Sequence, residues 1–147
     1  MNRIKIELPG IFHFSTLITI RITDLNYGGH VGNDSFLSLI HEARQQFLRA
    51  HGYEELSLGG VGLIMADVAI EFKRELNYAD TIRISVAADG FDKLGFDLYY
   101  LLEYVNETET VIAGKAKTGM LCFDYTTGKK MVTPEAVIRK LGGPPDA

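Results

Sequence analysis

Apolar residues recur every three or four positions between Ser35 and His51, which is typical of an α-helix with one buried face. The apolar stripe consists of Phe36, Leu39, Ile40, Ala43, Phe47 and Ala50, and Leu37 and Leu48 widen it. Asn33 or Asp34 is suited to cap the start of this helix, and Gly52 is suited to end it. The sequence therefore predicts one long amphipathic helix over residues 35–51.

The period changes to two in the segments on either side of this helix. From Phe14 onward, every second residue between Ile11 and Thr23 is apolar or β-branched, which predicts a strand over 11–23. Residues 53–62 contain three glycines and predict a loop. Four further strands are expected over Leu63–Phe72, Thr81–Ala88, Leu94–Val105 and Val111–Tyr125, followed by a short helix from Pro134 to about Leu141.

The predicted strand over 63–72 has one wholly apolar face, which we expect to face the core. This face consists of Ile64, Ala66, Val68, Ile70 and Phe72. The opposite face carries Asp67, whose carboxylate needs a partner or a wet surface among such apolar neighbours. Arg44 lies near the apolar stripe of the helix, so its stem is expected to pack and its charged head to need a partner.

The order of these elements indicates an α+β fold. The links between the strands after the helix are too short for repeated parallel crossovers, so these strands are expected to be antiparallel. The single apolar stripe of the helix must be buried, and we expect it to pack against the sheet. We expect a long helix against a curved antiparallel sheet of about five strands, in a single domain over residues 1–147.

Composition and charge exclude several classes of function and cellular location. The 147 residues are 46% hydrophobic and 23% charged with a net charge of −4, and no long basic run occurs, so nucleic-acid binding is not expected. Cys122 is the only cysteine, which excludes an intrachain disulfide and is compatible with a reducing compartment. The first residues lack the apolar core of a signal peptide, and no apolar stretch approaches about 20 residues. We expect a cytoplasmic protein without a membrane segment.

The turn between the first strand and the helix, Asp24–Asp34, concentrates groups that could take part in chemistry. Its glycines Gly28 and Gly29 permit positive φ or a close approach of the backbone to a ligand, although a plain turn would use them equally well. The backbone N–H groups at the start of a helix can hold a developing oxyanion, and His30 lies just before them. Neither a dinucleotide-binding fingerprint nor a P-loop is present.

Two other kinds of site find little support in the spacing of the residues. The four histidines, His13, His30, His41 and His51, are scattered and form no HExxH motif, so no metal site is expected. Ser35 and Ser38 do not lie in a GxSxG sequence, which argues against a serine nucleophile.

The turn has the pattern D-x-N-x-x-G-H-V-x-N and is followed by His41-Glu42-Ala43-Arg44 on the helix. This combination resembles the 4-hydroxybenzoyl-CoA thioesterase-like group of hot-dog-fold acyl-CoA thioesterases, and the turn is also similar to that of plant acyl-ACP thioesterases. The segments Phe72–Leu76 and Tyr78–Asp80 resemble the end of the second strand and the following Gly-Asp turn of that group, with Ala79 in place of glycine.

The resemblance implies a hot-dog fold in which the sheet wraps the helix, and a homodimer or homotetramer with active sites at subunit interfaces. It implies hydrolysis of an acyl-CoA to the free acid and CoA, by base-activated water or by an acid nucleophile. Coenzyme A would enter as part of the substrate, and no other cofactor is implied. A non-catalytic acyl-thioester binding protein and an acyl-ACP thioesterase remain the alternatives.

The resemblance also implies roles for particular residues. The backbone N–H of Asn33 would polarise the thioester carbonyl, while Asn26 and His30 would orient substrate or water. Many members of the group carry a catalytic aspartate where this chain has Asn26, and an amide cannot take a proton from water. A second branch of the fold places its base on the helix, about two turns past the N-terminal donor, which corresponds here to His41 or its neighbour Glu42.

The phosphates of coenzyme A call for basic side chains near the cleft. Lys73 and Arg74, at the end of the second predicted strand, are the residues expected to bind them, although a solvated strand end would also carry such charges.

Overall fold

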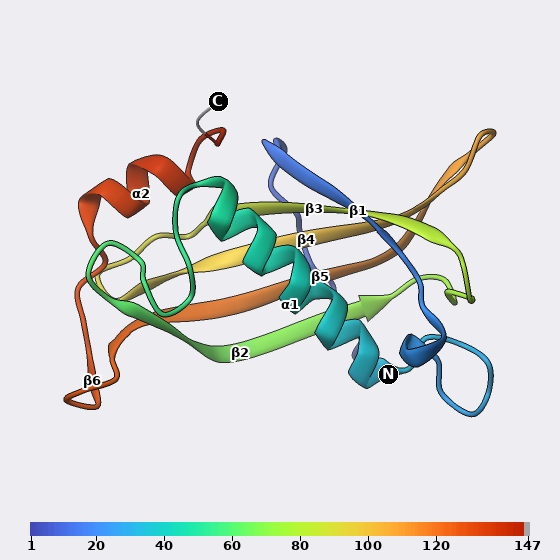
Figure 1. Cartoon of the computed structure of the whole chain (residues 1–147), viewed down its shortest axis with the longest axis horizontal. Helices are drawn as coiled ribbons and strands as arrows, with labels where there is room; N and C mark the ends of the chain where they lie inside the picture. The colour runs from blue at the N-terminus through green and yellow to red at the C-terminus, as the bar shows by residue number, and fades with distance from the viewer. Residues whose placement is uncertain (146–147) are drawn as a thin grey trace.

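The computed structural model describes residues 1–145, so the last two residues of the predicted domain lie outside the described part. A long helix, α1 (Asn33–Ala50), lies across one face of an antiparallel sheet (Figure 1). The strands are β1 (Phe14–Thr19), β2 (Gly62–Phe72), β3 (Thr81–Asp89), β4 (Gly95–Val105), β5 (Thr110–Asp124) and β6 (Lys129–Lys130), and a short helix, α2 (Glu135–Leu141), follows. Their order in the sheet is β1-β3-β4-β5-β2, and β6 pairs with the end of β5. The predicted α+β architecture is confirmed.

Helix α1 begins two residues before the predicted start. Its N-cap is Gly32, whose extended backbone (φ −71°, ψ 159°) lets its carbonyl accept the first helical bond from the N–H of Phe36 at 3.0 Å. The prediction that Asn33 or Asp34 caps the helix is therefore wrong, because both residues already lie inside it. At the other end Gly52 takes the left-handed conformation (φ +83°) just past the helix, as predicted.

The apolar stripe of α1 covers the sheet largely as expected. The buried residues of the helix are Phe36, Leu39, Ile40, Ala43, Arg44, Phe47 and Leu48. They pack against the even-numbered residues of β3 and β4, including Ile84 and Tyr100, to form one core. Leu37 is an exception, since it is exposed to solvent rather than widening the stripe.

Strand β1 is shorter than the predicted strand over 11–23. After Thr19 the chain turns into a 3₁₀ segment over Ile22–Asp24, where the backbone N–H of Arg21 donates to the carboxylate of buried Asp24 at 2.8 Å. This side-chain-to-backbone bond competes with strand pairing. A period of two continues through Ile22, so the pattern alone could not locate the end of the strand.

The other predicted strands and α2 agree with the structure to within a residue at each end. Strand β2, however, contains a bulge between Met65 and Asp67 that the sequence did not reveal. Before the bulge Met65 lies opposite buried Met120, and after it Val68 lies opposite buried Thr118. Since cross-strand partners share a face, the side of β2 that faces α1 changes from odd to even residues at the bulge.

The predicted core face of β2 is therefore wrong in its first half. Ile64 lies on the face opposite α1, and Ala66 is the extra residue of the bulge. The second half has the expected orientation, but β2 is an edge strand that α1 does not fully cover. As a result Val68 and Phe72 remain 39% and 52% exposed.

Asp67 finds its partners beside this bulge. Its Oδ1 accepts the backbone N–H of Gly119 and a bond from Lys117 Nζ, both at 2.8 Å. The Lys117 bond, together with that N–H, lowers the pKa of the Asp67 carboxyl. The expectation that this carboxylate needs a partner is confirmed.

The charged side chain of Arg44 is buried beneath α1. Its Nε donates to Glu55 Oε1 at 2.7 Å and its Nη1 to the hydroxyl of Tyr100 at 3.3 Å. Tyr100 and Thr118 share a hydrogen bond of 2.8 Å, and burial raises the pKa of the Tyr100 phenol, which keeps it protonated. The loop after α1 is thereby joined to the centre of the sheet.

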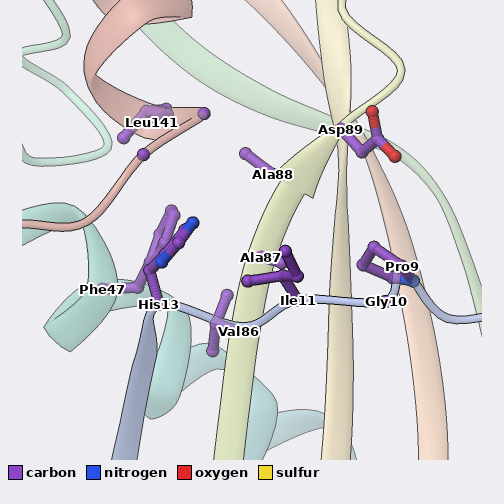
Figure 2. Close-up of a pocket in the computed structure, with 12 residues that line it drawn as sticks. Pro9, Gly10, Ile11, His13, Phe47, Val86, Ala87, Ala88, Asp89 and Leu141 are labelled. Atoms are coloured by element: carbon purple, nitrogen blue, oxygen red, sulfur yellow. The ribbon is translucent and has the colours of Figure 1, made fainter.

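The N-terminal segment, residues 2–13, crosses the sheet on the side away from α1 (Figure 1). Its first half lies beside the end of β2, where Ile6 is buried and its N–H donates to Glu71. Its second half lies beside the end of β3 and α2, around a hollow of about 420 Å³ (Figure 2). The segment therefore spans the sheet from one edge toward the other.

The Arg44–Glu55 pair yields a stability prediction. Replacing Glu55 by alanine leaves a nearly buried guanidinium without its partly exposed carboxylate, which we expect to lower the free energy of unfolding by about 2 kcal/mol. Glu54→Ala is the matched control, because Glu54 is exposed and a surface change of this kind alters stability by about 0.5 kcal/mol or less. Urea unfolding measures both. Equal effects of the two substitutions would contradict the role given to the pair.

Candidate active site

The loop between the 3₁₀ turn and α1 closes on itself. The N–H of Asn26 donates to the carbonyl of His30 at 2.8 Å, and the N–H of Gly29 donates to the carbonyl of Asn26 at 3.1 Å. Gly29 needs its left-handed backbone (φ +84°) for this turn. The Asn26 side chain accepts the N–H of Gly28 at 2.9 Å, so the amide braces the loop that presents His30.

Two main-chain bonds fasten this loop to the rest of the protein. The N–H of Val31 donates to the carbonyl of Leu76 at 3.0 Å, and the N–H of Gly32 donates to the carbonyl of Asp24 at 3.3 Å. The first bond brings the segment that follows β2 against the start of α1. A cavity of about 390 Å³ lies between them, with an apolar wall formed by Phe36 and Phe72.

The N-terminus of α1 opens onto this cavity at Asn33. The N–H groups of Asn33, Asp34 and Ser35 have no carbonyl one turn earlier in the helix to bind, and Gly32 has no side chain that could cap them. These groups carry the partial positive charge of the helix dipole. An oxygen on which negative charge develops would be stabilised there.

His30 is held between two side chains of the segment after β2. Its Nδ1 lies 3.2 Å from Asn77 Oδ1, and its Nε2 lies 3.5 Å from Glu75 Oε2. When Nδ1 carries the proton and donates to Asn77, a neutral imidazole presents an acceptor at Nε2. Two acceptors then face each other at 3.5 Å, which leaves no room for a water molecule between them but suits a proton that the pair shares.

Glu75 also lines the cavity, although no pattern in the sequence predicts a role for it. In the sequence it is one of three charged residues in Phe72–Leu76, and that segment indicates the end of a strand rather than a catalytic group. What brings it to His30 is the main-chain bond between Val31 and Leu76, and no local pattern predicts that bond. The proximity of this carboxylate to a histidine is therefore a property of the folded chain alone.

Asn26, His30 and Asn33 lie in one cavity with Lys73 and Arg74, and their predicted roles stay predictions. Lys73 Nζ pairs with Glu71 at 3.0 Å. The guanidinium of Arg74 lies over the ring of Tyr104, 4.0 Å from its centre. Their predicted role in phosphate binding stays a prediction.

His41 and Glu42 lie elsewhere on α1 and do not line this cavity. His41 Nε2 is 3.3 Å from Glu55 Oε1. Glu42 accepts a bond of 2.7 Å from Gln46. Within one copy of the chain neither residue shares the cavity with Asn33, and the expectation that one of them activates water stays a prediction.

The described part of the chain offers neither a metal cluster nor a membrane-spanning helix. Within residues 1–145 no three His, Cys, Asp or Glu side chains are grouped closely enough to hold a metal ion. No helix in the same range is both long and apolar enough to cross a membrane. The cytoplasmic location stays a prediction.

Solved structures of several thioesterases share this fold. An Asp-to-Asn variant of a 4-hydroxybenzoyl-CoA thioesterase, complexed with 4-hydroxybenzoyl-CoA, is 13% identical with a TM-score of 0.78, over 87% of this chain and 97% of that one. A 1,4-dihydroxy-2-naphthoyl-CoA thioesterase from Synechocystis is 20% identical with a TM-score of 0.76, over 89% and 98%. A thioesterase from Thermus thermophilus, complexed with coenzyme A and Zn, is 19% identical with a TM-score of 0.76, over 90% and 99%.

At these identities the likenesses establish the fold, and the predicted hot-dog architecture is confirmed. No curated protein matches the chain in sequence. The family model described as the thioesterase-like superfamily matches residues 20–141, a range that includes the loop, α1 and the whole cavity described above. The chain belongs to the thioesterase-like superfamily.

Proposed function

We propose that this protein hydrolyses acyl-CoA thioesters to a free acid and CoA. The observation that carries the proposal is the single cavity that joins the N-terminus of α1 at Asn33 to the His30–Glu75 pair. Membership of the thioesterase-like superfamily supports a thioester as the bond that is cleaved. The solved relatives complexed with coenzyme A or 4-hydroxybenzoyl-CoA support CoA as its carrier.

The carbonyl of the thioester is placed at the start of α1. There its oxygen accepts the N–H of Asn33, and the helix dipole stabilises the negative charge that develops when water attacks. The acyl group then lies against Phe36 and Phe72, the apolar wall of the cavity. This pose uses the N–H groups that the helix itself leaves unpaired.

The base in this mechanism is Glu75, with His30 as its partner. A water molecule held by the Glu75 carboxylate loses a proton to it as the water oxygen bonds to the carbonyl carbon, and His30 Nε2, 3.5 Å from Glu75 Oε2, shares that proton. The C–S bond then breaks, the sulfur leaves with the electron pair, and the proton returns to it to give the free thiol. Asn26 braces the loop, and the carboxylate lies across the cavity from it.

We further propose that the protein acts as a homodimer or homotetramer. Strand β2 forms one edge of the sheet, and Ile64, Met65 and Val68 on this edge are 39%, 43% and 39% exposed. An uncovered edge strand with apolar side chains is a surface that proteins normally pair or cover. A second copy could also bring His41 or Glu42 to the cavity, and this keeps the helix residues as competing bases.

A specific observation favours a second function, the binding of acyl thioesters without catalysis. Asn26 stands where many thioesterases of this group have aspartate, and its side-chain oxygen is occupied by the N–H of Gly28. Thiol release from a panel of acyl-CoA and acyl-ACP substrates distinguishes the functions. Saturable binding of an acyl thioester without any thiol release would support the function of a binding protein. Thiol release from acyl-ACP substrates alone would show that the carrier of the acyl group is ACP and not CoA.

Substitution of Glu75 tests the base. Glu75→Gln keeps the shape but removes the proton acceptor, and we expect kcat for acyl-CoA hydrolysis to fall by about 10²-fold or more. Glu109→Gln, in the exposed turn between β4 and β5, is the matched control and retains the wild-type rate. If Glu75→Gln keeps full activity while Glu42→Gln or His41→Ala loses it, the base lies on the helix.

Substitution of Asn33 tests the oxyanion donor. Asn33→Pro removes this one N–H, and proline is tolerated at the first position of a helix. The preceding Gly32 already has the extended backbone that a following proline requires. We expect kcat to fall about 10²-fold with α1 intact by circular dichroism. Asn33→Ala keeps the N–H and should lose far less activity; equal losses would show that the side chain matters instead.

A further inference from the structure

A second groove lies beside the cavity, and its lining is basic. It has a volume of about 820 Å³, roughly twice that of the cavity at Asn33, and lies between residues 2–7 and the end of β2. Four cationic side chains line it, Arg3, Lys5, Lys73 and Lys115, against two carboxylates, Glu7 and Glu71. The chain as a whole carries a net charge of −4, so this groove is a cationic site on an anionic protein.

Internal pairs use only part of this positive charge. Glu71 accepts the N–H of Ile6 and pairs with Lys73, and these two contacts, together with the charge of Lys115 on the neighbouring strand, lower the pKa of the Glu71 carboxyl. Within residues 1–145, Arg3, Lys5 and Lys115 have no carboxylate within 4.0 Å. Three cations from two separate parts of the chain therefore line the groove without a close ion pair in the described residues, although Lys115 lies across from Glu71 on the neighbouring strand.

The groove and the cavity at Asn33 lie on opposite sides of the end of β2 (Figure 1). Phe72, the last residue of β2, and the following Lys73 line both, so only the end of this edge strand separates the two hollows. A ligand with its thioester at the start of α1 can extend past the end of β2 and place its other end among the cations. The buried side chain of Ile6, and the hydrogen bond that the Ile6 backbone N–H donates to Glu71, hold the N-terminal segment in position for this contact.

We propose that residues 2–7 and Lys115 form a subsite for the phosphate groups of the nucleotide end of coenzyme A. The inference rests on the proposed function and extends it, because it assigns carrier recognition to Arg3, Lys5 and Lys115. Phosphates form strong charge-assisted hydrogen bonds with arginine and lysine, and arginine can bind one in a bidentate manner. The volume lies in the range of small-molecule sites, which favours a nucleotide over the surface of a carrier protein.

Carrier preference is the property that tests this subsite. The assay compares kcat/KM for one acyl group carried on CoA, on 3′-dephospho-CoA and on pantetheine, which lacks all the nucleotide phosphates. We expect wild type to prefer acyl-CoA over acyl-pantetheine by about tenfold or more, and R3A/K5A and Lys115→Ala to lose most of that preference. The control variant K129A/K130A removes two positive charges from exposed β6, and we expect it to keep the wild-type preference for acyl-CoA.

Binding of adenosine 3′,5′-bisphosphate to wild type and to R3A/K5A gives a readout that does not need catalysis. The subsite predicts binding to wild type that weakens about tenfold in R3A/K5A and weakens with added salt. Unchanged carrier preference in R3A/K5A, or equal binding of the bisphosphate, would overturn the subsite even in an active thioesterase. Bisphosphate binding without hydrolysis of any thioester would uphold the subsite and overturn the proposed activity.

Discussion

The candidate site depends on one main-chain hydrogen bond, from the N–H of Val31 to the carbonyl of Leu76. It joins the loop before α1 to the segment that follows β2, two stretches that the sequence separates by more than forty residues. On one side of this junction lie His30 and the free N–H groups of the helix, and on the other lies Glu75. Because a backbone bond needs no particular side chain, it can hold the cavity together whatever polar side chains surround it.

Because the backbone holds the cavity together, the site can accommodate an asparagine at position 26 in place of an aspartate. Its side-chain oxygen accepts the N–H of Gly28, a bond that an aspartate could also make, so the loop keeps its form with either residue. What the amide cannot supply is a proton acceptor. In the proposed mechanism that task passes to Glu75, which faces the same cavity from the opposite segment, and the helix N-terminus keeps its part.

Much of the fold could be predicted from the sequence, because a period of 3.6 or 2 is a local property. The long helix, four of the strands and the turn at Gly52 follow from such patterns. The errors arose where a single contact overrides the pattern, as at Asp24, which ends β1, and at the bulge near Ala66, which reverses the faces of β2. The motif located Asn26, His30 and Asn33, but Glu75 and the N-terminal groove depend on contacts between distant segments, which no local spacing encodes.

A structure of the protein with a non-hydrolysable thioether analogue of an acyl-CoA would test the central claim most directly. We predict the carbonyl oxygen at about 2.7–3.2 Å from the backbone nitrogen of Asn33, and an ordered water within hydrogen-bond distance of the Glu75 carboxylate. A carbonyl bound beside His41 or Glu42, with the cavity at the start of α1 empty, would contradict this mechanism.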